Sequence, residues 1–494
     1  MTHIVSKAPL VGFAVALLAL SGCAGPGPKL FPTHASENTK PETRTYDLDQ
    51  DGRDDFLETL NDDGRVVSLA RDKDNDGVFE HRVVLTDIPS EERHEFFLLL
   101  DSIPHALVAE AWEQGRFRYF HPPSRVIAPF PVMTDLSIAE FFGISPCPGL
   151  ESEYFDGKRL QSGYMNYASG KNTPWHAFMD YTMWSVLHGE SYSDPLPWYG
   201  RELRRIQEEV NKRSDQPRTR AYVVGTSAIG ASLGEDGHRQ ALDRLDRYCQ
   251  QLIADSDGRT RITLMSDHGH AFVPSQRIPL DDILREQGYR VGKTLEKPQD
   301  VVIPQFGIVT YAAIHTTEPA QVAKIVLGVE GVELAIYPSP DRSTIYVLNK
   351  DGRSTIEANH ESDAIRYKYS VVEADPLNLQ RAWASLRTDE QGYVSDHELF
   401  EATKSHEMPD AVARIWRAFH GLVENVPQLI VTTRDGYHCG SAYMSRRIDL
   451  IGAHGNLRTM SSTGFLMTMA GELPEVMRMS DACETLAKRG VTLK

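Results

Sequence analysis

The residues with the clearest chemical potential are a carboxylate and an imidazole side by side at the end of an apolar run. Ile262 to Met265 has the composition of a short buried strand, and Asp267 and His268 follow it in the stretch Ser266-Asp267-His268-Gly269. Open α/β sheets place their sites at the carboxyl ends of strands, and aspartate and histidine both bind metals. The sequence therefore predicts two metal-capable side chains at a sheet edge.

Three other candidate residues follow predicted strands: Asp101, Thr134 and His454. The preceding strands are, in that order, Glu95 to Leu100, Ser124 to Phe130 and Gln428 to Thr432. An alcohol ionises far above neutral pH, so Thr134 needs a divalent cation beside it to become a nucleophilic alkoxide. Taken singly, Asp101 also fits a turn residue and Thr134 a helix N-cap. Together the residues indicate a zinc-type site, or a manganese site, with a hydroxyl nucleophile.

The elements that position these residues alternate between strands and helices. Further strands are predicted at Ala221 to Gly225 and Arg261 to Met265, and helices at Asp243 to Ile253 and Ala411 to Phe419. This alternation predicts an α/β fold with helices on both faces of one sheet. The expected organisation is a signal peptide (1–22), a tether (23–44), Asp-Gly repeats (45–86), a core (87–276), an inserted α/β cap (277–400) and the rest of the core (401–494).

The order of these motifs resembles the alkaline phosphatase superfamily, closest to its nucleotide pyrophosphatase and type I phosphodiesterase branch. The motifs are Asp101, Pro131-Val132-Met133-Thr134, Ser266-Asp267-His268-Gly269 and His454-Gly455. The resemblance implies that Thr134 is the nucleophile and that Asp101, Thr134, Asp267 and His268 hold one metal. It also implies that His454 helps to hold a second metal. A sulfatase is disfavoured, because its Cys-x-Pro-x-Arg type of nucleophile motif is absent.

The chain departs from this family after the third predicted strand. The family has an Asp-x-x-x-His motif there, but Ser227 and Ala231 occupy the two ligand positions. Neither side chain is a credible zinc ligand, and one remaining histidine holds zinc poorly. Three residues are candidate substitutes: Asp236 and His238, which follow within a turn or two, and His438 in the stretch Gly436-Tyr437-His438-Cys439-Gly440. The expected cofactor is therefore zinc in one site, with the second site incomplete.

The segment 45–86 has the spacing of calcium-binding loops. The first loop carries carboxylates at EF-hand positions 1, 3, 5, 9 and 12 with Gly52 at position 6; these carboxylates are Asp47, Asp49, Asp51, Asp55 and Glu58. A second loop has Asp72, Asp74, Asp76 and Gly77, with Glu80 at position 9 and Val83 at position 12. No amphipathic helix flanks either loop, so a small turn-rich calcium repeat is predicted. Asp-Gly as a plain hairpin turn is the alternative.

The amino terminus has the pattern of a secretory signal. Lys7 precedes the apolar run Leu10 to Leu20, and Leu20-Ser21-Gly22-Cys23 resembles a bacterial lipobox. The run is too short to span a bilayer as a helix. By this resemblance Cys23 carries a lipid that anchors the protein to the membrane of the cell envelope. Ala24, which follows the cysteine, favours the outer membrane over the inner one.

Composition limits the ligands and partners. Acidic residues number 69 against 52 basic ones, for a net charge of −17, which argues against nucleic-acid binding. Four cysteines remain after Cys23, and three disulfide pairings are open among them: Cys147, Cys249, Cys439 and Cys483. The function expected is hydrolysis of small phosphate esters or diesters at the envelope. The alternative is a catalytically degenerate, calcium-stabilised binding or structural module.

Overall fold

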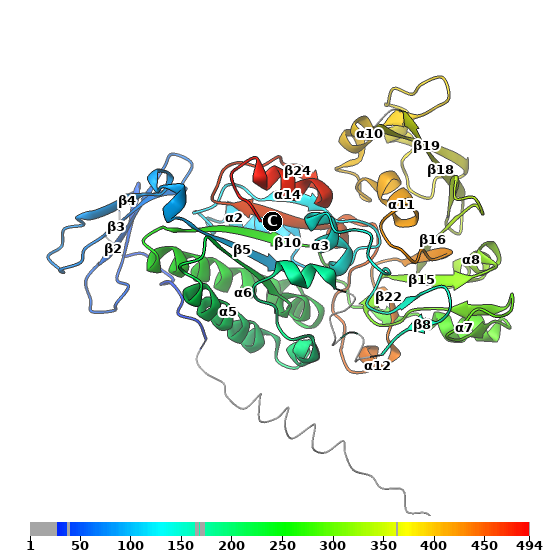
Figure 1. The fold of residues 1–494 in the computed structure, drawn as a ribbon, viewed down its shortest axis with the longest axis horizontal. Helices are drawn as coiled ribbons and strands as arrows, with labels where there is room; N and C mark the ends of the chain where they lie inside the picture. Colours follow the sequence, from blue (N-terminus) through cyan, green and yellow to red (C-terminus); the bar gives the residue numbers. More distant parts are fainter. Residues whose placement is uncertain (1–26, 37–39, 164–166, 168–172, 362–363, 494) are drawn as a thin grey trace, which may run out of the picture.

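The computed structural model describes residues 27–36, 40–163, 167, 173–361 and 364–493, and the ribbon is shown in Figure 1. The predicted signal segment 1–22 and Cys23 lie outside the described residues. In the part of the chain that is described, no helix is both long and apolar enough to cross a membrane.

A six-stranded sheet carries the candidate site. Its strands run in the spatial order β24 (Val476–Arg478), β6 (Ser124–Ile127), β23 (Thr463–Thr468), β10 (Thr260–Ser266), β5 (His94–Leu100) and β9 (Arg218–Val223). Strands β9, β5 and β10 are parallel neighbours, and β23 is antiparallel to both β10 and β6. The mixed α/β architecture that the sequence predicts is confirmed.

Side-chain alternation along β5 places apolar residues on both faces of this sheet. Phe96, Leu98 and Leu100 enter one core, whereas Phe97 and Leu99 enter the other. Such a two-sided strand must be covered by helices on both faces. One face is covered by α2 (His105–Glu113), α5 (Pro195–Lys212) and α6 (Gly225–Asp255), and the other by α3 (Thr134–Phe142) and α14 (Met479–Ala487). In Figure 1, α5 and α6 lie on one side of β5 and β10 and α14 lies on the other.

A nine-stranded sheet forms a second layer beside the first (Figure 1). Its strands, in spatial order, are β12 (Arg290–Val291), β13 (Asp300–Val302), β15 (Tyr311–Thr316), β21 (Leu429–Thr433), β16 (Val332–Pro338), β17 (Thr344–Leu348), β18 (Arg353–Glu361), β19 (Ala364–Glu373) and β20 (Val394–Ser395). The helices of this region are α7 (Leu280–Glu286), α8 (Pro319–Leu327), α9 (Gln380–Trp383), α10 (Asp396–Thr403) and α11 (Ala411–Phe419).

The remaining short elements lie outside these two sheets. They are the strands β7 (Tyr154–Phe155), β8 (Leu160–Gln161), β11 (Gln276–Arg277), β14 (Ile308–Val309) and β22 (Tyr437–Gly440), the short helices α12 (Ala442–Ser445) and α13 (Thr459–Ser462), and the 3₁₀ turns η1 (Leu85–Asp87), η2 (Ser90–Glu92), η3 (Pro174–Phe178) and η4 (Ser185–Tyr192).

Two strand expectations need correction. The strand predicted at Gln428 to Thr432 exists as β21, but it pairs with β15 and β16 of the nine-stranded sheet and not with the core strands. The core strand in its expected place is β23, which is antiparallel. In addition, Gly225 begins α6 and does not end β9, because the chain turns into the helix directly after Val223. Apolar periodicity identifies a buried strand but does not say which sheet it joins.

The four-stranded sheet of the Asp-Gly repeats packs against the core sheet's helices. Its strands are β1 (Thr43–Tyr46), β2 (Phe56–Leu60), β3 (Val66–Arg71) and β4 (His81–Val84). Glu58 on β2 is 1% exposed and accepts hydrogen bonds from the hydroxyls of Tyr119 and Tyr46. Its side chain thus joins the repeat to the core.

The disulfide pairings left open by the sequence do not form. Cys147, Cys249 and Cys439 are buried free thiols, and each of the three pairings would need them.

Glu58 makes stability depend on pH in a defined direction. Burial raises the pKa of Glu58 to about 7, from 4.5. The folded state therefore binds this proton more tightly than the unfolded chain, and Glu58 costs stability as the pH rises from about 4.5 to about 7. We expect Glu58→Gln to remove up to about 3 kcal/mol of that loss. Urea unfolding of both proteins with a calcium chelator at pH 5 and pH 8 measures it.

Glu92→Gln removes an exposed carboxylate and serves as the matched control. It should follow the pH profile of the wild type. Identical profiles for Glu58→Gln and the wild type would contradict the assignment.

Candidate active site and metal centre

Three of the predicted metal ligands meet at the carboxyl edge of the core sheet. The register pairs Ser266 with Leu100, so the residues that follow β10 and β5 emerge side by side. Asp101, Asp267 and His268 are buried, and one donor atom from each lies within 4.8 Å of the others. These three residues therefore lie together at the strand ends, where the sequence predicts them.

Backbone and hydroxyl donors fix the two carboxylates. Asp101 accepts hydrogen bonds from the Ser102 hydroxyl and from the Tyr222 hydroxyl, both at 2.5 Å. Asp267 Oδ1 accepts from the backbone N–H groups of Ser102 and His268, at 3.0 and 2.9 Å. Asp267 Oδ2, by contrast, accepts no hydrogen bond of ordinary geometry within the described residues and lies 3.4 Å from His268 Nε2. One buried oxygen is therefore left for another ligand.

The electrostatics of this group favour a cation. Burial, and then the nearby charge of Asp101, raise the pKa of Asp267 well above its usual value, whereas hydrogen bonding from Ser102 and Thr134 lowers it. No lysine or arginine of the described chain forms an ion pair with Asp101 or Asp267. Two buried carboxylates without a counter-charge are costly unless a proton or a metal compensates them. The donor set therefore fits a divalent cation.

Thr134 lies at the start of α3, directly beside this group. Its Oγ1 is 3.3 Å from His268 Nε2. His268 donates its Nδ1–H to the carbonyl of Gly269 at 2.9 Å, which leaves the Nε2 lone pair facing Thr134 and Asp267. Met133, not Thr134, occupies the N-cap position, and Thr134 is the first helical residue. Thr134 thus lies in the first turn of α3, and the backbone N–H groups of a first helical turn can bind an anion.

His454 adjoins the site but is not a member of the three-residue metal group. Its ring stacks on that of His268 with centroids 4.1 Å apart, and its Nδ1 hydrogen bonds to the carbonyl of Val132 at 3.0 Å. Burial, and then the neighbouring His268, lower the pKa of His454 to about 3. The imidazole is therefore neutral, with Nε2 as its remaining ring nitrogen.

The second metal position of the family has no equivalent ligand set. Ser227 Oγ lies 3.4 Å from Ser102 Oγ, next to Asp101, and Ala231 packs in a small apolar cluster with Leu450 and Ala453. A serine hydroxyl and a methyl group do not hold zinc. Ser227 and Ala231 therefore do not fit a second metal ion at this position.

The candidate substitutes are engaged elsewhere. Asp236 is exposed and pairs with Arg239 at 3.5 Å. His238 Nε2 hydrogen bonds to the carbonyl of Thr226 at 2.8 Å. Both ring nitrogens of His438 contact serine hydroxyls, those of Ser275 and Ser445, at 2.9 Å each. None of the three belongs to a metal-capable group of the described chain.

The two Asp-Gly loops gather their carboxylates to different extents. The second loop brings together Asp72, Asp74, Asp76 and Glu80, and the first brings together only Asp47, Asp49 and Asp51. In the first loop Asp55 Oδ1 accepts the N–H of Leu48 at 2.6 Å, and Glu58 points into the protein interior. The expectation that Glu58 is a calcium ligand is therefore wrong, because Tyr119 and Tyr46 take its carboxylate.

Tyr222 is a site residue that sequence reasoning missed. It lies on β9 among apolar residues, and its hydroxyl holds Asp101. A buried tyrosine hydroxyl needs a partner, and this is the only signal that the sequence offered.

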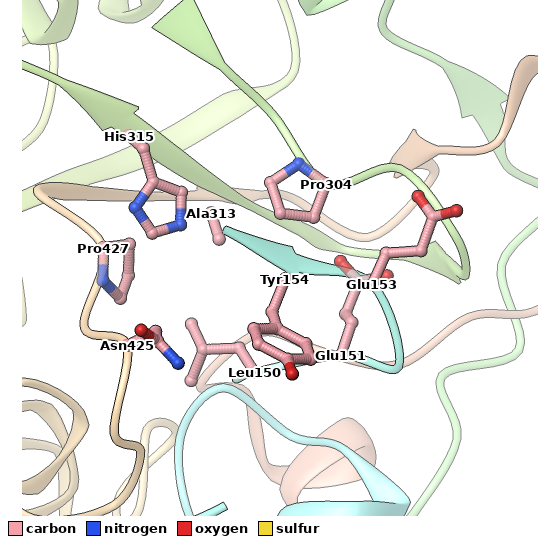
Figure 2. A pocket seen from close by; sticks show the side chains of 9 residues that line it. All are labelled: Leu150, Glu151, Glu153, Tyr154, Pro304, Ala313, His315, Asn425 and Pro427. Atoms are coloured by element: carbon pink, nitrogen blue, oxygen red, sulfur yellow. The ribbon is translucent and has the colours of Figure 1, made fainter. Parts of the chain in front are cut away.

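A cavity away from the site is shown in Figure 2. It is about 10 Å³ in volume and is lined by residues that include Glu151, Tyr154 and His315. It has room for little more than one water molecule, and none of the predicted site residues lines it.

The mixed α/β fold thus places a threonine hydroxyl beside three buried side chains that could hold a metal ion. Residues 190–456 match the model of the type I phosphodiesterase / nucleotide pyrophosphatase family. This stretch is more than half of the chain, so the chain belongs to that family and is a phosphoester hydrolase by class. Asp101 and Thr134 precede the matched stretch, whereas Ser227, Asp267 and His454 lie within it.

Several solved structures resemble the chain at low identity. Murine ectonucleotide pyrophosphatase/phosphodiesterase 5 has 12% identity over 81% of this chain and 95% of its own, with a TM-score of 0.44. The human protein of the same name has 13% identity over 80% and 95%, with a TM-score of 0.43. Phosphonoacetate hydrolase from Sinorhizobium meliloti 1021 has 12% identity over 86% and 97%, with a TM-score of 0.41. No curated protein has a sequence that matches this chain. Similarity at this level identifies no substrate.

The missing ligands predict the metal stoichiometry. We expect chelator-treated, zinc-reloaded protein to bind one zinc ion at the core site, and the double variant Ser227→Asp/Ala231→His to bind two, because it restores the family's donors next to His454. Elemental analysis of the dialysed protein in calcium-free buffer measures both. Asp267→Asn is the control and should lose the first ion. Two equivalents in the wild type would contradict the prediction.

Proposed function

We propose that the protein hydrolyses phosphate esters or diesters with Thr134 as the nucleophile and one divalent cation, zinc in preference to others, held by Asp101, Thr134, Asp267 and His268. The observation that carries this proposal is the position of Thr134 Oγ1, 3.3 Å from His268 Nε2, beside three buried donors that lie within 4.8 Å of one another.

The residues supply a two-step substitution at phosphorus. Thr134 loses its hydroxyl proton to solvent and Oγ1 attacks in line; the P–Oγ1 bond forms as the ester P–O bond breaks, and the alcohol leaves with a proton taken from solvent. Water then attacks the threonyl phosphate, releases the phosphate product and returns the hydroxyl. A cation bound to this donor set would lower the pKa of the Thr134 hydroxyl and neutralise charge on the phosphate. The N–H groups at the start of α3 are placed to bind the phosphate oxygens.

Zinc is favoured because the donors combine carboxylates with an imidazole in a group of few ligands. A single metal leaves one of the attacking and leaving oxygens without cation stabilisation. Loss of one such interaction typically lowers kcat by about 10²- to 10³-fold. We therefore expect slow turnover compared with an enzyme that holds two metals.

Removal of the hydroxyl tests the nucleophile. Thr134→Ala should lower kcat on aryl phosphate mono- and diesters by at least about 10³-fold, because no covalent step remains. Thr134→Ser keeps a hydroxyl and is the matched control, with substantial activity retained. Wild-type protein loaded with zinc but without Thr134-dependent turnover would leave the binding or structural module as the function.

We further propose that both Asp-Gly loops bind calcium and that a lipid on Cys23 holds the protein at the cell envelope, preferentially at the outer membrane. The two loops share one geometry, which supports the calcium proposal. Gly52 N–H donates to Asp47 Oδ2 at 2.8 Å, and Gly77 N–H donates to Asp72 Oδ2 at 2.7 Å. Oxygen donors in a tight loop of this kind suit calcium.

Calcium binding predicts a calcium-dependent melting temperature. Asp76→Ala and Asp51→Ala should both reduce the rise in Tm that calcium produces, with the larger loss for Asp76→Ala because its loop gathers four carboxylates. Asp63→Ala alters the intervening Asp63-Gly64 turn, outside both groups, and serves as the control. Differential scanning calorimetry with and without calcium measures the shift. An unchanged shift in all three variants would mark the loops as turns only.

A further inference from the structure

Arg414 is a buried cation at the junction of the two sheets. It lies on α11, is 1% exposed and forms four hydrogen bonds. Its Nη1 donates to the carbonyls of Pro409 and Leu457, at 3.0 and 3.3 Å. Its Nη2 donates to the Ser462 hydroxyl at 2.8 Å and to the carbonyl of Pro129 at 3.3 Å.

Packing alone does not account for this arginine. The nearest carboxylate in sequence, Asp410, forms two hydrogen bonds with Arg478, at 2.7 and 2.9 Å. Arg414 is thus held by neutral oxygens, and burial lowers its pKa to about 9. A buried cation without an ion-pair partner is expensive, and an apolar side chain of similar volume is often no less stable. A role in holding particular carbonyls is therefore indicated.

Two of those carbonyls belong to the chain segments that carry Thr134 and His454. Pro129 lies in the segment between β6 and the Thr134 helix, and Leu457 lies three residues after His454. The same segments contact each other directly. Val132 N–H donates to the Gly455 carbonyl at 3.1 Å, and His454 Nδ1 donates to the Val132 carbonyl at 3.0 Å.

Ser462 and its neighbour Ser461 extend this support to the backbone at Asn456, Gly455 and Gly269. Ser462 Oγ, which accepts from Arg414, donates to the carbonyl of Asn456 at 3.2 Å. Ser461 Oγ accepts the N–H of Gly455 at 2.9 Å, and its carbonyl accepts the N–H of Gly269 at 3.1 Å. Arg414 and the two serines thus fix both segments from one side.

We propose that Arg414 is a positioning residue that sets the nucleophile segment 129–134 against the histidine segment 454–457. The expected effect on kcat rests on the proposed function. The expected effect on the order of the two segments rests on the hydrogen bonds alone. Asp101 and Asp267 follow other strands and form no hydrogen bond with Arg414, so these two carboxylates keep their geometry without it.

Arg414→Met and Arg414→Lys test this proposal. Methionine removes the charge, and lysine keeps the charge but cannot reach four acceptors from a planar fork. We expect both variants to lower kcat by about 10- to 10²-fold with KM changed less than about threefold, because the reacting hydroxyl is misplaced while binding contacts persist. Zinc content should stay at the wild-type value. Arg204→Met, which removes a partly exposed arginine of α5, is the control with wild-type kinetics.

Hydrogen exchange gives a readout that needs no substrate. Amides in 129–134 and 454–457 should exchange faster in Arg414→Met, while those of β10 keep wild-type protection. Millimolar methylguanidinium should restore kcat in Arg414→Ala, and urea at equal concentration should not. Wild-type exchange in both segments of folded Arg414→Met overturns the proposal, even if the enzyme is inactive on every phosphate ester tested. Inactivity of the wild type itself would overturn the proposed function instead.

Discussion

The electrostatic repulsion between two buried carboxylates, Asp101 and Asp267, is the constraint on which the rest of the site depends. Both are held by fixed donors: the hydroxyls of Tyr222 and Ser102 bind Asp101, and the backbone N–H groups of Ser102 and His268 bind Asp267. Such a pair is unfavourable in a low-dielectric interior unless something positive lies between the two groups. The hydrogen bonds therefore hold the two carboxylates in a geometry that is favourable only when a proton or a cation is bound between them.

The parallel part of the sheet makes this arrangement possible. Strands β9, β5 and β10 end at one edge, so residues far apart in sequence meet without a dedicated loop. The segments that carry Thr134 and His454 lack such strand pairing to each other. They depend on the direct contacts of Val132 with Gly455 and on the buried guanidinium of Arg414. Two different means of support thus serve one site: strand register for the metal donors, and hydrogen bonds to a buried cation for the nucleophile.

Sequence reasoning succeeded where one strong local rule applies. Asp101, Asp267 and His268 were expected together because apolar runs that end in polar residues mark strand ends, and strand ends converge. It failed where the outcome depends on tertiary partners. Periodicity could not place β21 in the nine-stranded sheet, and EF-hand spacing could not show that Glu58 turns inward to Tyr119. Tyr222 and Arg414 were missed for the same reason: their acceptors are carboxylate and carbonyl oxygens from distant segments.

The replacement of two family ligands by Ser227 and Ala231 changes the chemistry more than the fold. The helix that carries both positions still forms, with a non-helical residue at Gly234, and Leu450 and Ala453 pack against Ala231. His454 remains as a neutral imidazole, stacked on His268 and hydrogen bonded to Val132, without the two partner ligands that the family resemblance implies. A phosphate group bound here would meet less positive charge and a more apolar wall. The rate of hydrolysis would fall least for substrates whose leaving group is a stable anion, because such a leaving group needs little stabilisation.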